Sequence, residues 1–331
     1  MKKIIISKEF DPYFNIAAEH ELFLGSEEDV HLFLWQNDAS VIIGRNQNLY
    51  VECNLPYLRE HNIKTVRRFS GGGAVYHDKG NVNFTFITKE NCVSQAAFID
   101  IIESAMAGLG IHCEFSGRND LLYKNQKFSG HAYYTDGDNY MYHGTILVNV
   151  DLAQLEKALT PSKLKLKSKG IESVKSRVIN LYEINRNITT SGVMDALIGA
   201  FDSRNIEYIS KENLEPPLEK FLSSDDWLYA QSPKFDIELE RKFSFGNVSV
   251  YITITDHLIQ SIKIYTDSLK PYNFKACENE LKGKSFTEQA VWDCITNTVW
   301  SGKKQLHPWP DAVTIQPPRI VTGHQRIFQK I

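Results

Sequence analysis

The chain has 331 residues with a formal net charge of -3, and 42% of its residues are hydrophobic. A chain of this length can bury a sizeable core and fits two domains better than one. Its acidic balance argues against a nucleic-acid-binding protein with a large basic face. The five cysteines are widely spaced without a CxxC pair, which argues against a zinc knuckle or disulfide framework and favours a reducing compartment.

Membrane association is not expected from the sequence. No stretch approaches the roughly 18 apolar residues of a membrane span, and the apolar run at residues 4–7 is too short for a signal-peptide core. We therefore expect a soluble, cytoplasmic protein that binds neither membranes nor nucleic acid, and we expect a monomer.

Hydrophobic periodicity predicts a mixture of strands and helices over the first 203 residues. In chain order these are a strand at 2–7, a helix at 14–24, strands at 31–36 and 40–44, a helix at 54–62, strands at 63–68 and 81–87, a helix at 96–110, a strand at 140–151 and a helix at 191–203. The elements follow no strict βαβ rhythm. We therefore predict an α+β fold with a mainly antiparallel or mixed sheet.

The last third of the chain has a different composition. Residues 210–245 are polar and contain prolines and scattered aromatic residues, which predicts a connecting segment rather than core. Two alternating runs within 245–268, joined at Asp256-His257, predict a hairpin, and residues 286–300 predict a helix. We therefore divide the chain into a large domain, 1–240, and a small α+β domain, 241–331.

An arginine pair runs into three consecutive glycines, Gly71–Gly73. Glycines let a ligand approach bare backbone N–H groups, and the guanidinium groups of Arg67 and Arg68 suit forked contacts to phosphate or carboxylate. The stretch predicts a phosphate site, with a flexible loop as the alternative. The P-loop and dinucleotide fingerprints are both absent, because Glu278 and Tyr76 occupy positions where those motifs need glycine.

The strand that follows has two different faces. Period-2 alternation places Val82, Phe84 and Phe86 on an apolar face and Asn81, Asn83 and Thr85 on a polar one. The polar face either lines a binding site or faces solvent. His77, just before the strand, is either a site residue or a turn or cap residue.

A second polar cluster occupies residues 116–134. Lys127 lies in a Lys-x-x-Gly-x-Ala pattern, which predicts a glycine-softened turn carrying one cation, with a solvated surface lysine as the alternative. Asn119-Asp120 is either a turn or the source of a carboxylate ligand for Mg²⁺.

Several of these stretches together resemble the lipoate–protein ligase family. The motifs are "DPYFNIAAE", "LFLWQNDASVIIGRNQN", "RRFSGGGAVYHDKGNVNFTF", "GRNDLLYKNQKFSGHAY", "HGTILVN", "KGIESVKSRVINL" and "IKIYTDSL". They occur in the family's order and cover nearly the whole chain. The resemblance implies a catalytic domain related to biotin ligases at 1–240 and a C-terminal accessory domain at 241–331.

The resemblance also implies an ATP-dependent reaction. Lipoate and ATP give lipoyl-AMP and pyrophosphate, and the lipoyl group then passes to a lysine of an acceptor protein. Lys127 is the expected catalytic residue and Asp120 the expected Mg²⁺ ligand. The expected ATP and adenylate contacts are Arg68, Gly71, Gly72, Gly73, Ala74, Val75, Tyr76, Asn81, Asn83 and Lys127. The expected lipoate contacts are Arg68, Gly73, His77, Lys127, Gly130 and His143.

The chemistry agrees with cations at this site. Adenylation brings two anions together and needs no general base, because carboxylate is already ionised at neutral pH. Transfer requires a proton to leave the acceptor lysine, and His77 and His143 are candidate bases. Phe14, Ile42 and Val75 are expected to line an apolar slot for the acyl chain.

His131 is a departure from the family pattern, which often has a small or amide side chain at this place. Its presence is either a neutral change at the rim of the site or a change in acyl-chain selection. Residues 163–177 carry six positive charges against one negative. This basic segment is either a solvated loop, a docking surface for acidic acceptor domains or a loop that closes over the adenylate.

The expected acceptors are lipoyl domains of 2-oxoacid dehydrogenase complexes, the glycine cleavage H protein, or both. A lipoyltransferase that uses preformed lipoyl-AMP or a lipoylated protein is the alternative, and a non-catalytic lipoyl-domain-binding module is a further one. A related octanoyltransferase would need a cysteine nucleophile, and no cysteine lies between Cys113 and Cys277.

Overall fold

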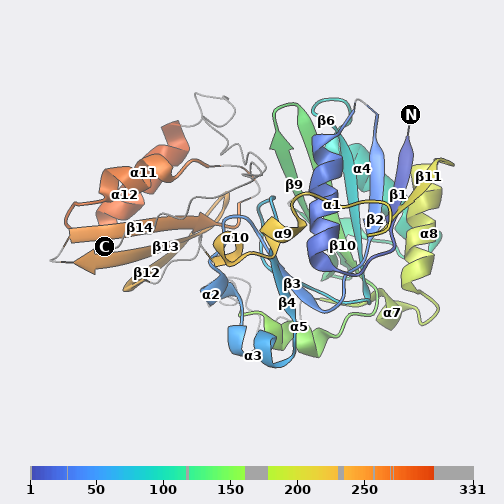
Figure 1. The fold of residues 1–331 in the computed structure, drawn as a ribbon, viewed down its shortest axis with the longest axis horizontal. Coiled ribbons are helices and arrows are strands. Elements are labelled where there is room, and N and C mark those ends of the chain that lie inside the picture. The colour runs from blue at the N-terminus through green and yellow to red at the C-terminus, as the bar shows by residue number, and fades with distance from the viewer. Residues whose placement is uncertain are drawn as a thin grey trace, which may run out of the picture.

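The computed structural model describes residues 2–27, 29–116, 119–160, 178–229, 235–255, 258–268, 270 and 272–301. The basic segment 163–177, the turn at Asp256-His257 and the C-terminal residues from 302 onward lie outside these ranges. Figure 1 shows a large sheet flanked by helices, and a smaller sheet with two helices at the other end of the molecule.

The large sheet has eight strands in the order β11-β1-β2-β6-β10-β9-β8-β7. Its strands are β1 (Lys3–Ser7), β2 (His31–Trp35), β6 (Asn81–Lys89), β7 (Glu114–Phe115), β8 (Asp120–Tyr123), β9 (Gln126–Asp136), β10 (Asn139–Leu147) and β11 (Ile206–Ile209). β1 pairs in parallel with β11 and β2, and the remaining pairs are antiparallel. The predicted α+β class with a mixed sheet is confirmed.

Helices cover both faces of this sheet (Figure 1). On one face, α4 (Gln95–Gly108) and α8 (Thr190–Phe201) pack on the apolar side chains of β6 and β10. On the other face lies α1 (Pro12–Leu24). Successive side chains of β2 point to opposite faces of the sheet. Leu32 and Leu34 pack in the core beneath α4 and α8, whereas Phe33 and Trp35 pack in the core beneath α1.

Helix α1 begins two residues before the predicted start. The Asp11 side chain accepts a hydrogen bond from the Tyr13 backbone N–H, and Pro12 occupies the first turn, where its missing N–H costs nothing. Within the described residues, no helix is long and apolar enough to cross a membrane.

The two-faced pattern of β6 is confirmed. Val82, Phe84 and Phe86 belong to the core beneath α4 and α8. The opposite face is also buried: Asn83 is 1% exposed, and Asn81 and Thr85 are fully enclosed. The alternative of a solvent-facing surface is therefore wrong.

A smaller sheet packs over the α1 side of the large one. Its strand order is β4-β3-β5, with β3 (Ser40–Ile43) parallel to β4 (Lys64–Arg67) and antiparallel to β5 (Val75–His77). Three short helices pack around it: α2 (Leu49–Glu52), α3 (Leu55–Glu60) and α5 (Leu152–Ala158). A further short helix, α7 (Leu181–Ile184), joins the core beneath α4 and α8. The loop between β4 and β5 carries the three glycines.

The C-terminal part has its own sheet and core. β12 (Ile237–Phe243), β13 (Gly246–Thr255) and β14 (Leu258–Thr266) form an antiparallel sheet covered by α11 (Lys275–Leu281) and α12 (Glu288–Ser301). The predicted hairpin pairing and the final helix are confirmed.

The prediction of a connecting segment at 210–245 is wrong. Two short helices, α9 (Glu219–Leu222) and α10 (Asp225–Tyr229), occur here, and β12 begins within the range. Leu218, Leu222 and Trp227 are buried in the α1 core. The polar composition concealed a few apolar anchors spaced along an otherwise exposed segment.

Arg67 fastens this segment to the small sheet. Its guanidinium is fully buried and donates hydrogen bonds to the backbone carbonyls of Gly44, Arg45, Gln47, Trp227 and Leu228 at 2.7–3.3 Å. The indole N–H of Trp227 in turn donates to the Arg67 carbonyl at 2.8 Å. Arg67 is thus committed to the fold and does not line the pocket described below.

We expect Arg67→Met to lower the free energy of unfolding by about 3 kcal/mol or more, because several buried carbonyls lose their donor. Urea denaturation followed by tryptophan fluorescence measures this change. Arg59→Met, at an exposed position of α3, serves as the matched control and should cost little. An equal effect of the two substitutions would contradict the assigned role.

Candidate functional site

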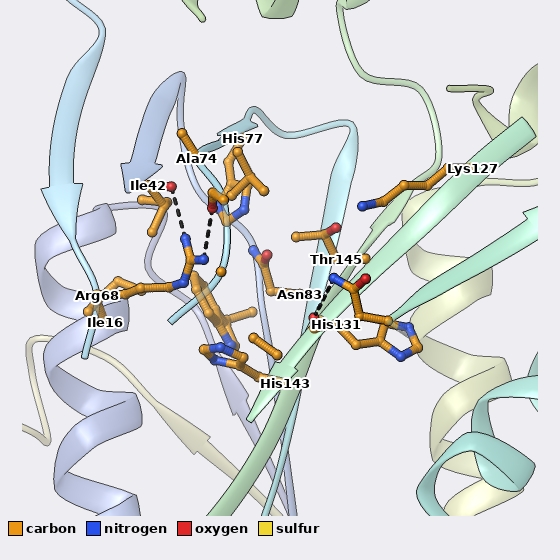
Figure 2. Close-up of a pocket in the computed structure, with 18 residues that line it drawn as sticks. Ile16, Ile42, Arg68, Ala74, His77, Asn83, Lys127, His131, His143 and Thr145 are labelled. Atoms are coloured by element: carbon orange, nitrogen blue, oxygen red, sulfur yellow. Dashed lines mark hydrogen bonds between the residues drawn. The ribbon is translucent and has the colours of Figure 1, made fainter. Parts of the chain in front are cut away.

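A cavity of about 130 Å³ lies between the large sheet, the small sheet and α1. Figure 2 shows the side chains that converge on it from β6, β9, β10 and the glycine loop. Ten of the predicted site residues line it. Arg68, Gly72, Gly73, Ala74, Val75 and His77 come from the arginine–glycine stretch, and Asn83, Lys127, Gly130 and His143 come from the large sheet.

Four predicted site residues are not among the lining residues. Gly71 lies against the backbone carbonyl of Ser268 in the C-terminal part. A Cβ added to Gly71 would be 2.8 Å from that carbonyl oxygen. Tyr76 is buried in a separate core cluster. Asn81 hydrogen-bonds to Asn83 at 2.9 Å behind the cavity wall. Asp120 forms an ion pair with Lys127, which does line the cavity.

Other residues of the cavity were missed. They are Ile16, Trp35, Asn119, Ala132, Gly144 and Thr145. Strand register explains Thr145, which lies directly opposite Asn83, but that pairing is not visible in the sequence. Of the three residues expected to form an apolar slot, Ile42 and Val75 line the cavity, whereas Phe14 is buried in the core beneath it.

Arg68 holds the glycine loop in place. Its Nη2 donates to the carbonyls of Gly71 and Gly73 at 2.7 and 2.8 Å, and its Nη1 donates to the carbonyl of Ile42 at 3.1 Å. Burial lowers the pKa of Arg68 to about 10, which leaves it charged at neutral pH. The side chain therefore shapes the loop while placing a fixed positive charge at the cavity wall (Figure 2).

The loop needs glycine at defined places. Gly72 has a φ of +91°, which L side chains rarely adopt. A Cβ on Gly44 would stand 2.2 Å from the carbonyl oxygen of Gly72. The left-handed conformation at Gly72 and the close backbone approach at Gly44, rather than flexibility, account for these two glycines.

Lys127 occupies a strand, not the predicted turn. The turn is Lys124-Asn125, both in the left-handed region, and β9 begins at Gln126. The Lys127 ammonium lies 2.7 Å from an Asp120 carboxylate oxygen and crosses over Gly130, where a Cβ would be 2.4 Å away. Gly130 thus clears the path of the lysine into the cavity.

His143 belongs to a buried hydrogen-bond chain. Its Nδ1 lies 2.8 Å from Glu19 and its Nε2 lies 2.8 Å from the Ser70 hydroxyl, which also accepts from Arg68. Burial opposes ionisation of Glu19, but the His143 ring, the Thr85 hydroxyl and the charge of Arg68 hold its pKa below the usual value. Both ring nitrogens of His143 are engaged within the protein, which argues against its role as a general base.

His131 is one of the residues that line the cavity, and its side chain is buried. Its ring nitrogens lie 2.5 Å from the Tyr142 hydroxyl and 2.8 Å from the Ser129 hydroxyl. The ring packs under Gly144, whose Cβ would be 2.7 Å from it. The ring forms part of the packed layer below Gly144, and both interpretations of His131, a neutral rim change and a change in acyl-chain selection, stay predictions.

Metal and thiol chemistry have few candidate groups here. Within the described ranges, no group of three or more His, Cys, Asp and Glu side chains could hold a metal ion. All five cysteines lie in those ranges, and none of them lines the cavity. The site therefore does not resemble that of a transferase with a thioester intermediate.

Family comparisons agree with this geometry. The model described as lipoyl protein ligase A/B catalytic domain matches residues 11–202, and the model described as bacterial lipoate protein ligase C-terminus matches residues 232–304. The chain belongs to the lipoate–protein ligase family. It is therefore an enzyme of that class.

Curated relatives match over most of their length. A lipoate-protein ligase A of Psychrobacter cryohalolentis is 38% identical over 283 residues, covering 81% of this chain and 84% of the relative. A lipoate-protein ligase A of Bdellovibrio bacteriovorus is 36% identical over 309 residues, covering 88% and 91%.

Solved structures share the fold. A P. falciparum protein crystallised in complex with lipoate is 30% identical, with a TM-score of 0.73 over 89% of this chain and 94% of its own. A lipoate-protein ligase A crystallised with ATP is 22% identical, with a TM-score of 0.53 over 71% and 97%, and supports the fold alone.

We expect the protein to lose stability in mild acid because three histidines are buried in their neutral form. Burial lowers the pKa of His77 and His131 to about 3 and that of His20 to about 4. Below pH 6.5, these imidazole groups bind protons in the unfolded chain, whereas in the folded protein they stay unprotonated. The contribution of these histidines to stability is therefore fully present above that pH. As the pH decreases below it, the free energy of unfolding falls by about 1.4 kcal/mol per pH unit for each histidine.

Urea denaturation at several values between about pH 7 and about pH 5 measures this slope. His131→Gln should reduce the slope by about a third of the histidine contribution, whatever its effect on absolute stability. His112→Gln, at an exposed position, is the control and should leave the slope unchanged. An unchanged slope in His131→Gln would contradict the buried neutral state.

Proposed function

We propose that this lipoate–protein ligase works in two steps in the described cavity. In the first, a carboxylate oxygen of lipoate attacks the α-phosphorus of ATP, forming lipoyl-AMP and releasing pyrophosphate. In the second, the amine of an acceptor lysine attacks the lipoyl carbonyl, AMP leaves, and the amine loses a proton. The observation that carries the proposal is the convergence of Lys127, Arg68 and the glycine loop on one cavity.

Charge explains why these groups suit the first step. Carboxylate and triphosphate repel one another, so the site must supply fixed positive charge where the two meet. Lys127 and the buried Arg68 supply it from opposite walls of the cavity (Figure 2). Both are held by protein contacts before any ligand binds, so little reorganisation is needed during reaction.

We propose that magnesium would bind at this site through one protein ligand. Mg²⁺ is usually bound by one or two carboxylates together with substrate phosphates. Asp120, next to Lys127, is the carboxylate that we propose would hold it. When bound, the ion would neutralise phosphate charge, while Lys127 and Arg68 bind and orient the anions.

For lipoate we propose the apolar part of the cavity. Ile16, Trp35, Ile42 and Val75 present hydrocarbon or aromatic surface there. The carboxyl end of lipoate would lie toward Lys127, His77 and the glycine loop.

We propose lipoyl domains of 2-oxoacid dehydrogenase complexes, the glycine cleavage H protein, or both as acceptors. An archaeal ligase from Thermoplasma acidophilum of the same fold was described together with its E2 lipoyl domain, with a TM-score of 0.62 and 24% identity over 72% of this chain. The cytoplasmic location and the monomeric state stay predictions.

We propose a small change to the boundary predicted between the two domains, residues 1–240 and 241–331. Residue 240 falls inside β12, which pairs along its whole length with β13. We therefore propose that the catalytic domain ends before Ile237 and that the accessory domain begins there.

Two experiments test the reaction. Pyrophosphate release on mixing the protein with lipoate and ATP tests adenylation, and its absence would leave the lipoyltransferase that uses preformed lipoyl-AMP or a lipoylated donor. Mass spectrometry of apo-acceptors should then show a gain of one lipoyl group that depends on ATP. Binding of acceptors without any such gain would favour the non-catalytic binding module.

We expect Lys127→Ala to reduce pyrophosphate release by about 10²-fold or more, because a preorganised cation at the reacting centre is lost. The assay is performed at saturating ATP and lipoate so that binding and turnover are separated. Lys124→Asn removes a lysine from the adjoining turn and keeps a residue that tolerates the left-handed conformation. Equal activities of the two variants would contradict the role of Lys127.

A further inference from the structure

Three buried polar side chains form a line that ends at the cavity. They are Asn15 of α1, Asn37 of the loop after β2, and His77 at the end of β5, with exposures of 0%, 0% and 2%. Asn15 hydrogen-bonds to Asn37 at 3.0 Å, and Asn37 hydrogen-bonds to Nδ1 of His77 at 3.2 Å. Two of these residues, Asn15 and Asn37, do not line the cavity.

The direction of every hydrogen bond in this line follows from its first member. The Asn15 amide nitrogen lies 2.9 and 2.8 Å from the backbone carbonyls of Glu9 and Gln36, which can only accept, so its two N–H groups are shared among these carbonyls and the Asn37 oxygen. The Asn15 amide oxygen lies 2.6 Å from the Ser7 hydroxyl. The orientation of Asn15 is thereby determined by its hydrogen-bond network.

Asn37 must follow that orientation. Its side-chain oxygen faces the Asn15 amide nitrogen, because two donors in contact would repel. The Asn37 amide nitrogen therefore donates to Nδ1 of His77. In a neutral imidazole, an accepting Nδ1 places the proton on Nε2.

His77 thus presents an N–H donor and no free lone pair. Its Nε2 is buried and has no hydrogen-bond partner among the residues that the structure describes, and the ring lines the cavity. A buried donor without a partner is costly, which indicates that a ligand supplies the acceptor. Burial and the charge of Arg68 lower the pKa of His77 to about 3, so the ring stays neutral.

We propose that His77 donates a hydrogen bond from Nε2 to the reacting carboxyl or acyl oxygen of lipoate, and that Asn37 and Asn15 are positioning residues that hold His77 in this tautomer. This rests on the proposed function. It removes His77 from the candidate bases, because its one lone pair is bonded to Asn37. The donor lies on the same cavity as Lys127, and both suit an oxygen that carries negative charge.

The substitution Asn37→Asp reverses the polarity of the line without changing its shape. The carboxylate still accepts from Asn15, but it requires a proton on Nδ1 of His77. A neutral ring then presents a lone pair to the substrate anion, and only the imidazolium presents N–H. The titratable side chains that lower the pKa of His77 are Arg68 and His143, and the new carboxylate would oppose their effect.

We expect the kcat/KM of Asn37→Asp for pyrophosphate release to be about 10²-fold below wild type at alkaline pH and to recover as the pH falls. Division of the variant's profile by that of wild type isolates the titration of His77. The control Asp38→Asn exchanges a carboxylate for an amide at the neighbouring position, where the side chain is 60% exposed. The ratio of its pH profile to that of wild type should not change with pH. A constant ratio across the pH range would overturn the proposal.

A second pair of variants covers the case in which Asn37→Asp does not fold. His77→Gln keeps an N–H donor at the position of Nε2, whereas His77→Leu removes it. We expect the glutamine variant to stay within about tenfold of wild type and the leucine variant to lose about 10²-fold. Equal losses in the two variants would overturn the proposal.

Imidazole-nitrogen NMR of histidine-labelled protein tests the tautomer without any reaction. The His77 signals, identified by their loss in His77→Gln, should show a protonated Nε2 and an unprotonated Nδ1 in the wild-type protein. The opposite assignment would overturn the proposal. Failure of the wild-type protein to release pyrophosphate would instead contradict the proposed function, and the NMR result would stand by itself.

Discussion

Burial of two adjacent guanidinium groups is the constraint on which the site depends. Arg67 is the last residue of β4 and Arg68 follows it, and their side chains bind different partners: Arg67 contacts α10 and the loop after β3, whereas Arg68 contacts the glycine loop. Each is buried, and each carries a charge that must be satisfied by hydrogen bonds. The backbone carbonyls that satisfy them come from the glycine loop, the loop after β3 and α10.

The consequence is a cavity whose walls are assembled from distant parts of the chain. Arg68 shapes the glycine loop on one side, while Lys127 reaches over Gly130 on the other, held by Asp120. Ion pairing with Asp120 gives the lysine a defined position before substrates arrive. A preorganised site of this kind stabilises developing charge at little reorganisation cost, which suits the joining of two anions.

Much of this could be predicted from local pattern. Period-2 alternation correctly separated the two faces of β6, and the glycines and arginines predicted an anion site in the stretch that lines the cavity. Pattern failed where distant contacts decide the outcome. The pattern predicted a turn at Lys127 because Gly130 and the polar neighbours are typical of turns, whereas pairing with β8 makes Lys127 a strand residue. Residues 210–245 read as a linker because only a few anchors, such as Trp227, are buried there.

By itself, the sequence determined the α+β class, most of the strands and helices, and the chemical character of the glycine stretch, because these depend on neighbours a few residues apart. Tertiary structure alone decided that Arg67 serves the fold while Arg68 reaches the cavity, that Lys127 meets Asp120, and that Asn15 and Asn37 determine which nitrogen of His77 carries its proton. Those outcomes depend on hydrogen bonds between residues far apart in the chain, and only the packed fold brings such partners within reach.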